Sequence, residues 1–302
     1  MAFSAQRPEW SVEGRDWPNR EFSRFVSAGG ISWHVQEMGD GPRLLLLHGT
    51  GAATHSFRDL APNLAKHFDL LAPDLPGHGF TDMPPSSGLS LAGMGRLVGI
   101  LLAKRGFEPD IAVGHSAGAA ILVEMALSGT IRPKVIIAVN GALLPIRGAS
   151  LFSPLAKLLF LNPLAPKVFA WRALSHDATR RLLEGTGSAI DARGIELYQR
   201  LFRKPGHVAG TLGMMANWDL DGLQRRISRL SVPLVLVSAA NDKAVSPQDA
   251  AIVAARVPVA RTMPLAEGGH LVQEENPEQV SDLVVAVARE AGAPARVETE
   301  RL

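Results

Sequence analysis

The chain of 302 residues contains no cysteine. It therefore has no disulfide framework, no thiol nucleophile and no thiolate ligand for a metal ion, and this composition fits a reducing cytoplasm. Four histidines of the first half fall on separate turns, namely His48, His55, His78 and His115. None of them has the i, i+4 partner of a helical zinc site. We expect neither a metal ion nor another cofactor.

Strong net charge and long basic runs are also missing. Lys and Arg number 31 against 29 Asp and Glu, for a formal net charge of +2. No block of Lys and Arg resembles the stripe that follows a nucleic-acid backbone, so we expect no nucleic-acid partner. Hydrophobic residues make up 46% of the chain, which is enough for a large core and excludes disorder of the chain as a whole.

No stretch of the sequence has the continuity of a membrane-spanning helix. Residues 1–20 mix charged residues with tryptophans and have no apolar centre, so we expect no signal peptide. The most apolar stretch, residues 151–171, is interrupted by three prolines and two lysines, which disfavour a bilayer-spanning helix. We predict a cytoplasmic protein, with peripheral membrane contact through residues 151–171 as an open alternative.

Short apolar runs alternate with stretches of helical periodicity. The expected strands are residues 25–26 and 31–36, which form an antiparallel hairpin, and then 43–47, 68–73, 111–114, 135–139, 234–238 and 260–265. The expected helices are residues 56–67, 89–104, 117–127, 247–255 and 277–290. This alternation predicts an α/β fold with a mostly parallel, eight-stranded sheet and helices on both faces.

The alternation pauses between the sixth and seventh expected strands. Residues 144–226 have helical patterns broken by prolines and glycines, without a convincing strand. We predict that they form an inserted helical cap. The predicted α/β core is then divided into residues 24–143 and residues 227–292.

One motif joins the fifth expected strand to the helix that follows it. Residues 114–118 read Gly-His-Ser-Ala-Gly. This G-x-S-x-G pattern at a strand-to-helix turn is typical of a nucleophile elbow, whose small residues leave room for a strained backbone and an exposed hydroxyl. We predict Ser116 as the nucleophile. The alternative is a chance match in a chain with 29 glycines, and the residues elsewhere in the chain must decide.

Two further residues follow strand ends in the order of a serine triad. Asp242 comes after the seventh expected strand and His270 after the eighth. Parallel strands bring their carboxyl ends to one edge of the sheet, so both side chains are expected to meet Ser116. His270 would take the serine proton while Asp242 orients the imidazole. Asp242 could instead be a turn residue, with Asp249 in reserve, and His270 could be a loop histidine bonded to backbone.

Hydrolysis through a tetrahedral intermediate also needs hydrogen-bond donors for the developing oxyanion. The helix after the elbow supplies the N–H of Ala117. The glycine-containing loop after the third expected strand supplies a second donor, for which we select Thr50, with Gly51 as the alternative. The predicted substrate-binding residues are His48, Gly49, Gly51 and His115, and His48 is also expected to brace the loop. For His55 and His78, a pocket group and an ordinary loop residue both remain open.

Taken together, these motifs resemble the α/β-hydrolase superfamily over residues 25–290, and the cap resembles that of its lidded members. A closer likeness is to the magnesium-chelatase accessory proteins of bacteriochlorophyll synthesis. The segments that carry it read WHVQ (33–36), HGTGA (48–52), DLPGHGF (74–80), GHSAGAA (114–120), NGALLP (140–145) and MMANW (214–218). This resemblance implies a role in photosynthetic pigment synthesis, with chelatase subunits as possible partners. It does not settle the reaction, because metal chelation requires no acyl hydrolysis.

Two functions follow from these observations. The first is a serine esterase acting on an apolar carboxylic ester, although a perhydrolase or a carbon–carbon bond hydrolase uses similar residues. The second is a non-catalytic module that binds a tetrapyrrole and presents it to the chelatase. Apolar cap residues that could cover such a ring are Leu159, Phe160, Leu161, Leu164, Phe169 and Trp171. Basic residues that could meet its carboxylates are Arg172, Arg180, Arg181, Arg200, Arg203 and Lys204. Ordinary cap packing and a solvated helix face are the simpler explanations of these two sets, and the role of Gln273 stays open.

Overall fold

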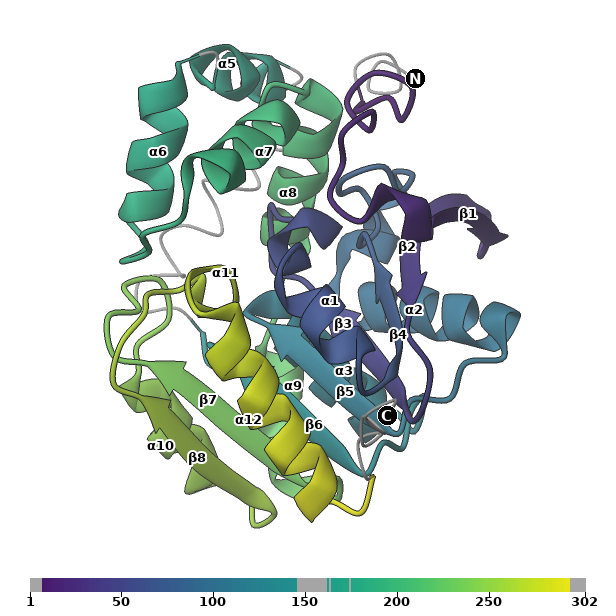
Figure 1. The fold of residues 1–302 in the computed structure, drawn as a ribbon, viewed down its shortest axis with the longest axis vertical. Coiled ribbons are helices and arrows are strands. Elements are labelled where there is room, and N and C mark those ends of the chain that lie inside the picture. The colour runs from purple at the N-terminus through teal and green to yellow at the C-terminus, as the bar shows by residue number, and fades with distance from the viewer. Residues whose placement is uncertain (1–6, 146–161, 163, 174, 294–302) are drawn as a thin grey trace, which may run out of the picture.

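A computed structural model describes residues 7–145, 162, 164–173 and 175–293. In that part of the chain, eight strands form one sheet in the order β1-β2-β4-β3-β5-β6-β7-β8. β2 pairs antiparallel with β1 and β4, and all the other neighbouring strands are parallel. The predicted mostly parallel, eight-stranded sheet is confirmed (Figure 1).

The strands are β1 (Ser23–Ala28), β2 (Ile31–Met38), β3 (Arg43–Leu47), β4 (Asp69–Pro73), β5 (Ile111–His115), β6 (Val135–Val139), β7 (Leu234–Ala239) and β8 (Ala260–Leu265). The α-helices are α1 (Leu60–Ala65), α2 (Leu91–Arg105), α3 (Ala117–Leu127), α5 (Ala165–Arg172), α6 (His176–Glu184), α7 (Ala192–Phe202), α8 (Pro205–Asn217), α9 (Asp221–Arg226), α10 (Gln248–Ala254), α11 (Val272–Glu275) and α12 (Pro277–Glu290). Short 3-10 helices are η2 (Arg20–Phe22), η3 (Thr54–Phe57), η4 (Ser86–Leu89) and η5 (Ile227–Arg229).

The central strands are apolar on both faces because helices cover both sides of the sheet. In β3, Leu45 and Leu47 pack into a cluster with α2 and α3, whereas Leu44 and Leu46 pack into a second cluster with α1 and α12. Alternate residues of a strand point to opposite faces, so a strand buried on both sides reads as a continuous apolar run. These two clusters form the core on which the loops at the carboxyl ends of the strands are held.

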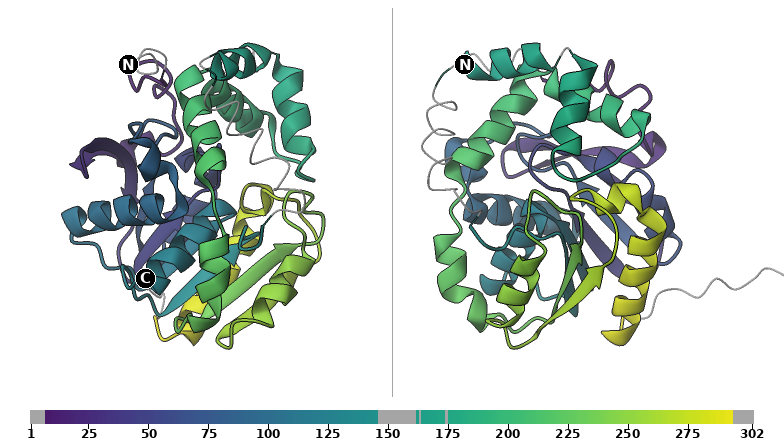
Figure 2. Two further views of the ribbon diagram at one scale, coloured as in Figure 1. Left: turned by 180° about the vertical axis from the view of Figure 1, so that it is seen from behind. Right: turned by 90° about the vertical axis from the view of Figure 1, so that its left-hand side faces the viewer.

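Helices α5, α6, α7 and α8 lie together beyond the carboxyl ends of the strands (Figures 1 and 2). They fall in the predicted cap, residues 144–226, of which residues 146–161 lie outside the described part of the chain, as do the predicted lid residues Leu159, Phe160 and Leu161. Leu223 of α9 belongs to the core cluster with α2 and α3, so α9 packs on the sheet. The division into core and cap stays a prediction.

The expected helix at residues 56–67 is wrong in its extent. The chain forms η3 at Thr54–Phe57 and then the short helix α1 at Leu60–Ala65. Pro62 lies in α1, and a proline inside a helix lacks an N–H donor and clashes with the carbonyl four residues earlier, here that of Arg58. A continuous helix from residue 56 is therefore disfavoured. α11 was not predicted at all, because one turn is too short to show a period.

Helix α8 is seated directly on two loops of the core. His207 in α8 donates from Nε2 to the carbonyl oxygen of Gly51 (3.0 Å) and accepts at Nδ1 from the N–H of Gly79 (3.0 Å). A Cβ atom on Gly210, one turn further on, would overlap the backbone of Gly77. The helix therefore meets the core backbone to backbone. No described helix is long and apolar enough to cross a bilayer.

Replacing Gly210 by alanine tests this close approach. We expect Gly210→Ala to lower the free energy of unfolding by about 1–3 kcal/mol, because the added methyl group has no room. The matched control is Gly222→Ala in α9, where an added Cβ would meet only a flexible Arg225 atom at 4.0 Å. The control should lose no stability, since alanine favours a helix. Urea unfolding of both variants is followed by circular dichroism. Equal midpoints would contradict the packing described.

Candidate active site

The predicted elbow is present, and its backbone is strained. Ser116 has φ 51° and ψ −118°, a conformation that side-chain-bearing residues rarely adopt and that costs about 1–3 kcal/mol. A Cβ on Gly114 would lie 2.5 Å from the backbone nitrogen of Ala119, and one on Gly118 would overlap the carbonyl oxygen of Leu47. Both glycines are required by close contacts, as the G-x-S-x-G pattern predicts.

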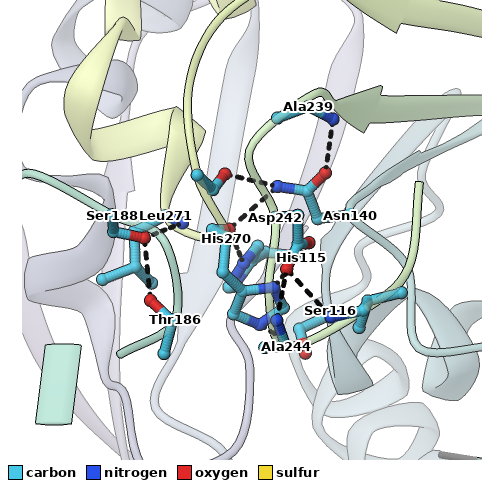
Figure 3. Close-up of polar contacts among 12 residues, drawn as sticks. His115, Ser116, Asn140, Thr186, Ser188, Ala239, Asp242, Ala244, His270 and Leu271 are labelled. Atoms are coloured by element: carbon cyan, nitrogen blue, oxygen red, sulfur yellow. Dashed lines mark hydrogen bonds and ion pairs between the residues drawn. The ribbon is translucent and has the colours of Figure 1, made fainter. Parts of the chain in front are cut away.

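The three residues predicted to act together are brought together by hydrogen bonds. His270 Nε2 lies 3.1 Å from Ser116 Oγ, and His270 Nδ1 lies 2.9 Å from Asp242 Oδ2 (Figure 3). The other carboxylate oxygen of Asp242 accepts the N–H groups of Ala244 and Val245, both at 2.8 Å. Asp242, and not Asp249, holds the position beside the imidazole. A carboxylate at Nδ1 fixes the tautomer in which Nε2 is free to accept a proton from serine.

Two side chains hold the backbone of His270. His115 Nε2 donates to the His270 carbonyl oxygen at 2.8 Å, and Asn140 Nδ2 donates to the same oxygen at 3.0 Å and to that of Gly269 at 2.9 Å. Asn140 Oδ1 accepts the N–H of Ala239 at the end of β7 (Figure 3). Because Nε2 of His115 is the donor, its buried Nδ1 carries no proton, and burial holds the pKa of His115 well below its usual value.

These contacts change the interpretation of two residues. His115 was predicted to bind substrate, but its Nε2 is engaged by backbone and its ring packs against that of His270, with centroids 4.7 Å apart. Asn140 lies in the segment NGALLP, for which the sequence predicts no chemical role. Its contacts join residues more than 90 positions apart, and no local pattern in the sequence signals them.

The loop predicted to supply an oxyanion donor lies against the elbow. A Cβ on Gly49 would be 3.0 Å from the Cβ of Ser116, so only glycine fits without displacement. His48 accepts the N–H of Leu75 at Nε2 (2.9 Å) and donates from Nδ1 to the carbonyl oxygen of Gly49 (2.8 Å). Both ring nitrogens of this buried histidine are thus used to brace the loop, and neither is free for a substrate.

The two predicted donors have different surroundings. Ala117 is the first residue of α3, so its N–H has no acceptor within the helix. Thr50 is held from the cap side, because its Oγ1 donates to the sulfur of Met214 in α8 at 3.4 Å. Gly51 has φ 79° and its carbonyl oxygen accepts from His207. Core and cap both position this loop.

A loop of the cap, residues 186–188, contacts the segments that carry Asp242 and His270. The carbonyl oxygen of Thr186 accepts the N–H of Lys243 (3.0 Å), next to Asp242. Ser188 Oγ accepts the N–H of Leu271 (2.9 Å), next to His270 (Figure 3). A Cβ on Gly187 would overlap the backbone of Asn241, so the loop and the core are in direct contact.

The model of the alpha/beta hydrolase family matches residues 44–283. The chain belongs to the alpha/beta hydrolase family. It is 35% identical over 274 residues to the magnesium-chelatase 30 kDa subunit of Rhodobacter capsulatus, across 89% of this chain and 95% of that one. The resemblances predicted from the motifs are therefore confirmed.

Other alpha/beta hydrolase relatives match less of the sequence or only the fold. The 2-hydroxy-6-oxo-2,4-heptadienoate hydrolase of Pseudomonas putida is 34% identical over 113 residues, across 36% of this chain and 41% of its own. The crystal structure of an alpha/beta hydrolase fold protein from Burkholderia ambifaria superposes with a TM-score of 0.75 at 22% identity, over 88% of this chain and 97% of that one. The second likeness supports the fold alone.

This alpha/beta hydrolase also has a buried polar cluster between cap and core. Glu274 in α11 forms an ion pair with Arg58 and accepts hydrogen bonds from Ser56 Oγ and from the hydroxyl of Tyr198 in α7, both at 2.8 Å. Gln273, whose role was left open, donates to Ser56 Oγ at 2.9 Å. Burial raises the pKa of Glu274, and Arg58 opposes this effect. Among the described residues, no group of three or more His, Asp or Glu side chains could hold a metal ion.

A second Ser–His–Asp arrangement occurs away from the elbow. His34 Nε2 lies 3.0 Å from Ser23 Oγ, and its Nδ1 lies 2.8 Å from Asp74 Oδ2. The carboxylate of Asp74 also accepts the N–H groups of Thr54 (2.7 Å) and Phe80 (2.9 Å). Ser23 has φ −76°, in ordinary extended backbone, and precedes no helix. This set ties β1 and β2 to the loops and lacks the features of an elbow.

The buried histidines predict a loss of stability in mild acid. Burial lowers the pKa of five of them: His48, His55, His78, His115 and, to about 4, His207. The unfolded chain takes up these protons below about pH 6.5, whereas the native state does not. The free energy of unfolding should therefore fall between about pH 6.5 and pH 4, by about 1.4 kcal/mol per pH unit for each such histidine. Burial also raises the pKa of Glu274 and of Asp69, which acts in the opposite direction, but these are two groups against five.

Urea unfolding at about pH 7.5 and about pH 5 measures this dependence. His207→Gln should reduce the slope by up to about one proton, because it removes a group that titrates only in the unfolded chain. The control is His67→Gln, at a partly exposed position. The same unfolding free energy at both pH values would show that these histidines are not kept neutral by folding.

Proposed function

We propose that this chain is a serine-dependent hydrolase of the esterase type. The observation that carries the proposal is the continuous set of hydrogen bonds from Ser116 Oγ through His270 to Asp242, with the serine on a strained turn at the start of α3. A serine hydroxyl is a weak nucleophile unless an adjacent base takes its proton, and this arrangement supplies the base and its orienting carboxylate.

The proposed reaction has two steps. Ser116 Oγ attacks the ester carbonyl as its proton moves to His270 Nε2, while Asp242 stabilises the imidazolium. The N–H groups of Ala117 and Thr50 would stabilise the oxyanion, and loss of one such donor typically costs about 3 kcal/mol of transition-state stabilisation. His270 then protonates the departing alcohol, which leaves an acyl-enzyme. Water, activated by the same imidazole, releases the acid and restores the serine.

The biological setting follows from sequence similarity. Identity of 35% to the magnesium-chelatase 30 kDa subunit of Rhodobacter capsulatus, across most of both chains, supports a role in bacteriochlorophyll synthesis together with magnesium chelatase. We propose an apolar carboxylic ester as the substrate class.

Labelling by a fluorophosphonate probe tests the proposed nucleophile. The wild-type protein should be labelled and should hydrolyse p-nitrophenyl esters, whereas Ser116→Ala should lose both activities, because the attacking oxygen is gone. Ser23→Ala is the matched control, since Ser23 also contacts a histidine that is paired with a carboxylate but lies in unstrained backbone. Labelling of Ser116→Ala at the wild-type level would refute the assignment.

The second candidate function is a non-catalytic module that binds a tetrapyrrole for magnesium chelatase. The name of the Rhodobacter relative supports it, because that protein is called a magnesium-chelatase subunit and not a hydrolase. In this case the triad would be retained without being used, and binding would depend on the cap and not on the serine hydroxyl.

Titration with protoporphyrin IX, followed by absorbance, distinguishes the two functions. If the chain is a binding module, the wild-type protein and the Ser116→Ala variant should shift the porphyrin spectrum equally. Both should also stimulate the chelatase subunits to the same extent. An esterase that acts in the pathway should instead lose its effect on pigment synthesis in the Ser116→Ala variant. Neither a spectral shift nor stimulation in either protein would remove the binding-module proposal.

A further inference from the structure

Helix α5 has an unusual distribution of side chains. Its small residues Ala165, Ala170 and Ala173 are buried, and Ala170 packs with Val208 and Leu212 of α8. Its large apolar residues face outward. The exposed fractions are 61% for Leu164, 53% for Val168, 45% for Phe169 and 70% for Trp171. The packing of α5 onto the cap therefore leaves these large side chains in contact with water.

The next helix, α6, also exposes one large apolar side chain. Leu182 of α6 is 59% exposed. We define the cap-end patch as Leu164, Val168, Phe169 and Trp171, which lie at the start of α5 and along it. Contiguous exposed apolar side chains of this size mark interaction sites more often than single exposed residues do.

Basic side chains accompany the patch. Exposed cations on the same two helices are Lys167, Arg172, Arg180 and Arg181. The two acidic residues there, Asp177 and Glu184, both lie near Arg180, at 2.9 and 4.0 Å. Residues 164–184 thus carry a formal net charge of +2 with histidine neutral, which equals the net charge of the whole chain. The complementary surface is therefore negatively charged.

The position of α5 makes the patch accessible to a flat surface. α5 lies at the end of the molecule farthest from the sheet, and α6 descends from it along the outside of the cap (Figures 1 and 2). A planar partner can therefore approach α5 without contacting the sheet. α5 also lies away from the carboxyl ends of β5, β7 and β8, which lead to Ser116, Asp242 and His270, so the role of the patch does not depend on catalysis (Figures 1 and 2).

We propose that the cap-end patch binds the surface of an anionic lipid bilayer. Trp171, Phe169, Val168 and Leu164 enter the interfacial region, where an aromatic ring is favoured and apolar area leaves water. Lys167, Arg172 and Arg181 reach anionic headgroups while their aliphatic stems lie along the same apolar boundary. A helix with large apolar residues outward and cations beside them suits this partner, which needs no shaped complementary groove.

Binding to vesicles tests the proposal in the full-length protein. Vesicles of phosphatidylcholine with about one third phosphatidylglycerol should sediment the protein in about 0.1 M salt, and pure phosphatidylcholine or about 0.5 M salt should weaken this binding. Of the five tryptophans, Trp171 alone is exposed. Its fluorescence emission should therefore shift to the blue on binding, and lipids that carry a quencher should reduce it.

Variants locate the contact. Trp171→Ser should weaken vesicle binding about tenfold, because burial of most of an aromatic side chain is lost. Trp171→Phe should keep most of the binding and lose the spectral shift. Lys167→Glu with Arg172→Glu should abolish the preference for anionic lipid. Matched controls are Ile252→Ser and Arg132→Glu, an exposed apolar residue in α10 and an exposed cation before β6. Both should bind vesicles as wild type does.

Three results would overturn the proposal. The first is no binding to anionic vesicles by a protein that has native circular dichroism. The second is equal loss of binding in the patch variants and in the controls. The third is a concentration-dependent dimer that Trp171→Ser dissociates, which would assign the patch to a second copy of this chain. Labelling of Ser116 by a fluorophosphonate is measured separately, so failure of the esterase proposal leaves this test unaffected.

Discussion

The arrangement of the site depends on the strained backbone of Ser116. A residue with a side chain stays in such a conformation only when its surroundings allow no relaxed alternative. Here the Ser116 N–H donates to Val139 at 3.0 Å, and its carbonyl oxygen accepts from Ala119 at 3.2 Å and Ala142 at 3.0 Å. Gly49, Gly114 and Gly118 leave room for the close contacts around the elbow, and the loop after β6 and the loop of His270 both form hydrogen bonds with the serine. The chemistry proposed for the hydroxyl is thus a consequence of backbone packing by its neighbours.

His270, the proposed base, is held by hydrogen bonds to its backbone. His270 lies on a loop, but its carbonyl oxygen receives hydrogen bonds from both His115 and Asn140, so the imidazole is oriented at the backbone as well as by Asp242. His115 directly precedes Ser116 in the sequence. The same turn therefore positions the hydroxyl of Ser116 and, through His115, the backbone of His270. Burial favours the neutral form of His115, so its ring adds no positive charge beside the imidazolium of His270 in the proposed reaction.

Much of this molecule could be predicted from local sequence patterns. β6, β8, α3 and α12 have the predicted bounds, because continuous apolar runs or regular helical periods specify them. The triad could be predicted because G-x-S-x-G and the strand order constrain where its members lie. The contacts of Asn140, Ser188 and the Glu274 cluster could not, since each joins side chains to distant backbone without a repeating pattern. Proline shortened one helix, and the outward-facing side chains of α5 became apparent only when the packing of α8 was known.

The contact of residues 186–188 with the loops of Asp242 and His270 also bears on how this cap can diverge in evolution. Substitutions on the exposed faces of α5 and α6 can change what the cap touches without contacting the loops of the core, whereas His207 and Met214 of α8 hold the loop of Thr50 and Gly51. The three-residue loop has no such freedom, because Gly187 lies against the backbone of Asn241 and Ser188 supplies an acceptor to the segment after the base. A cap exchanged with that of a relative would have to preserve this loop, since without it the segments of Asp242 and His270 lose these contacts.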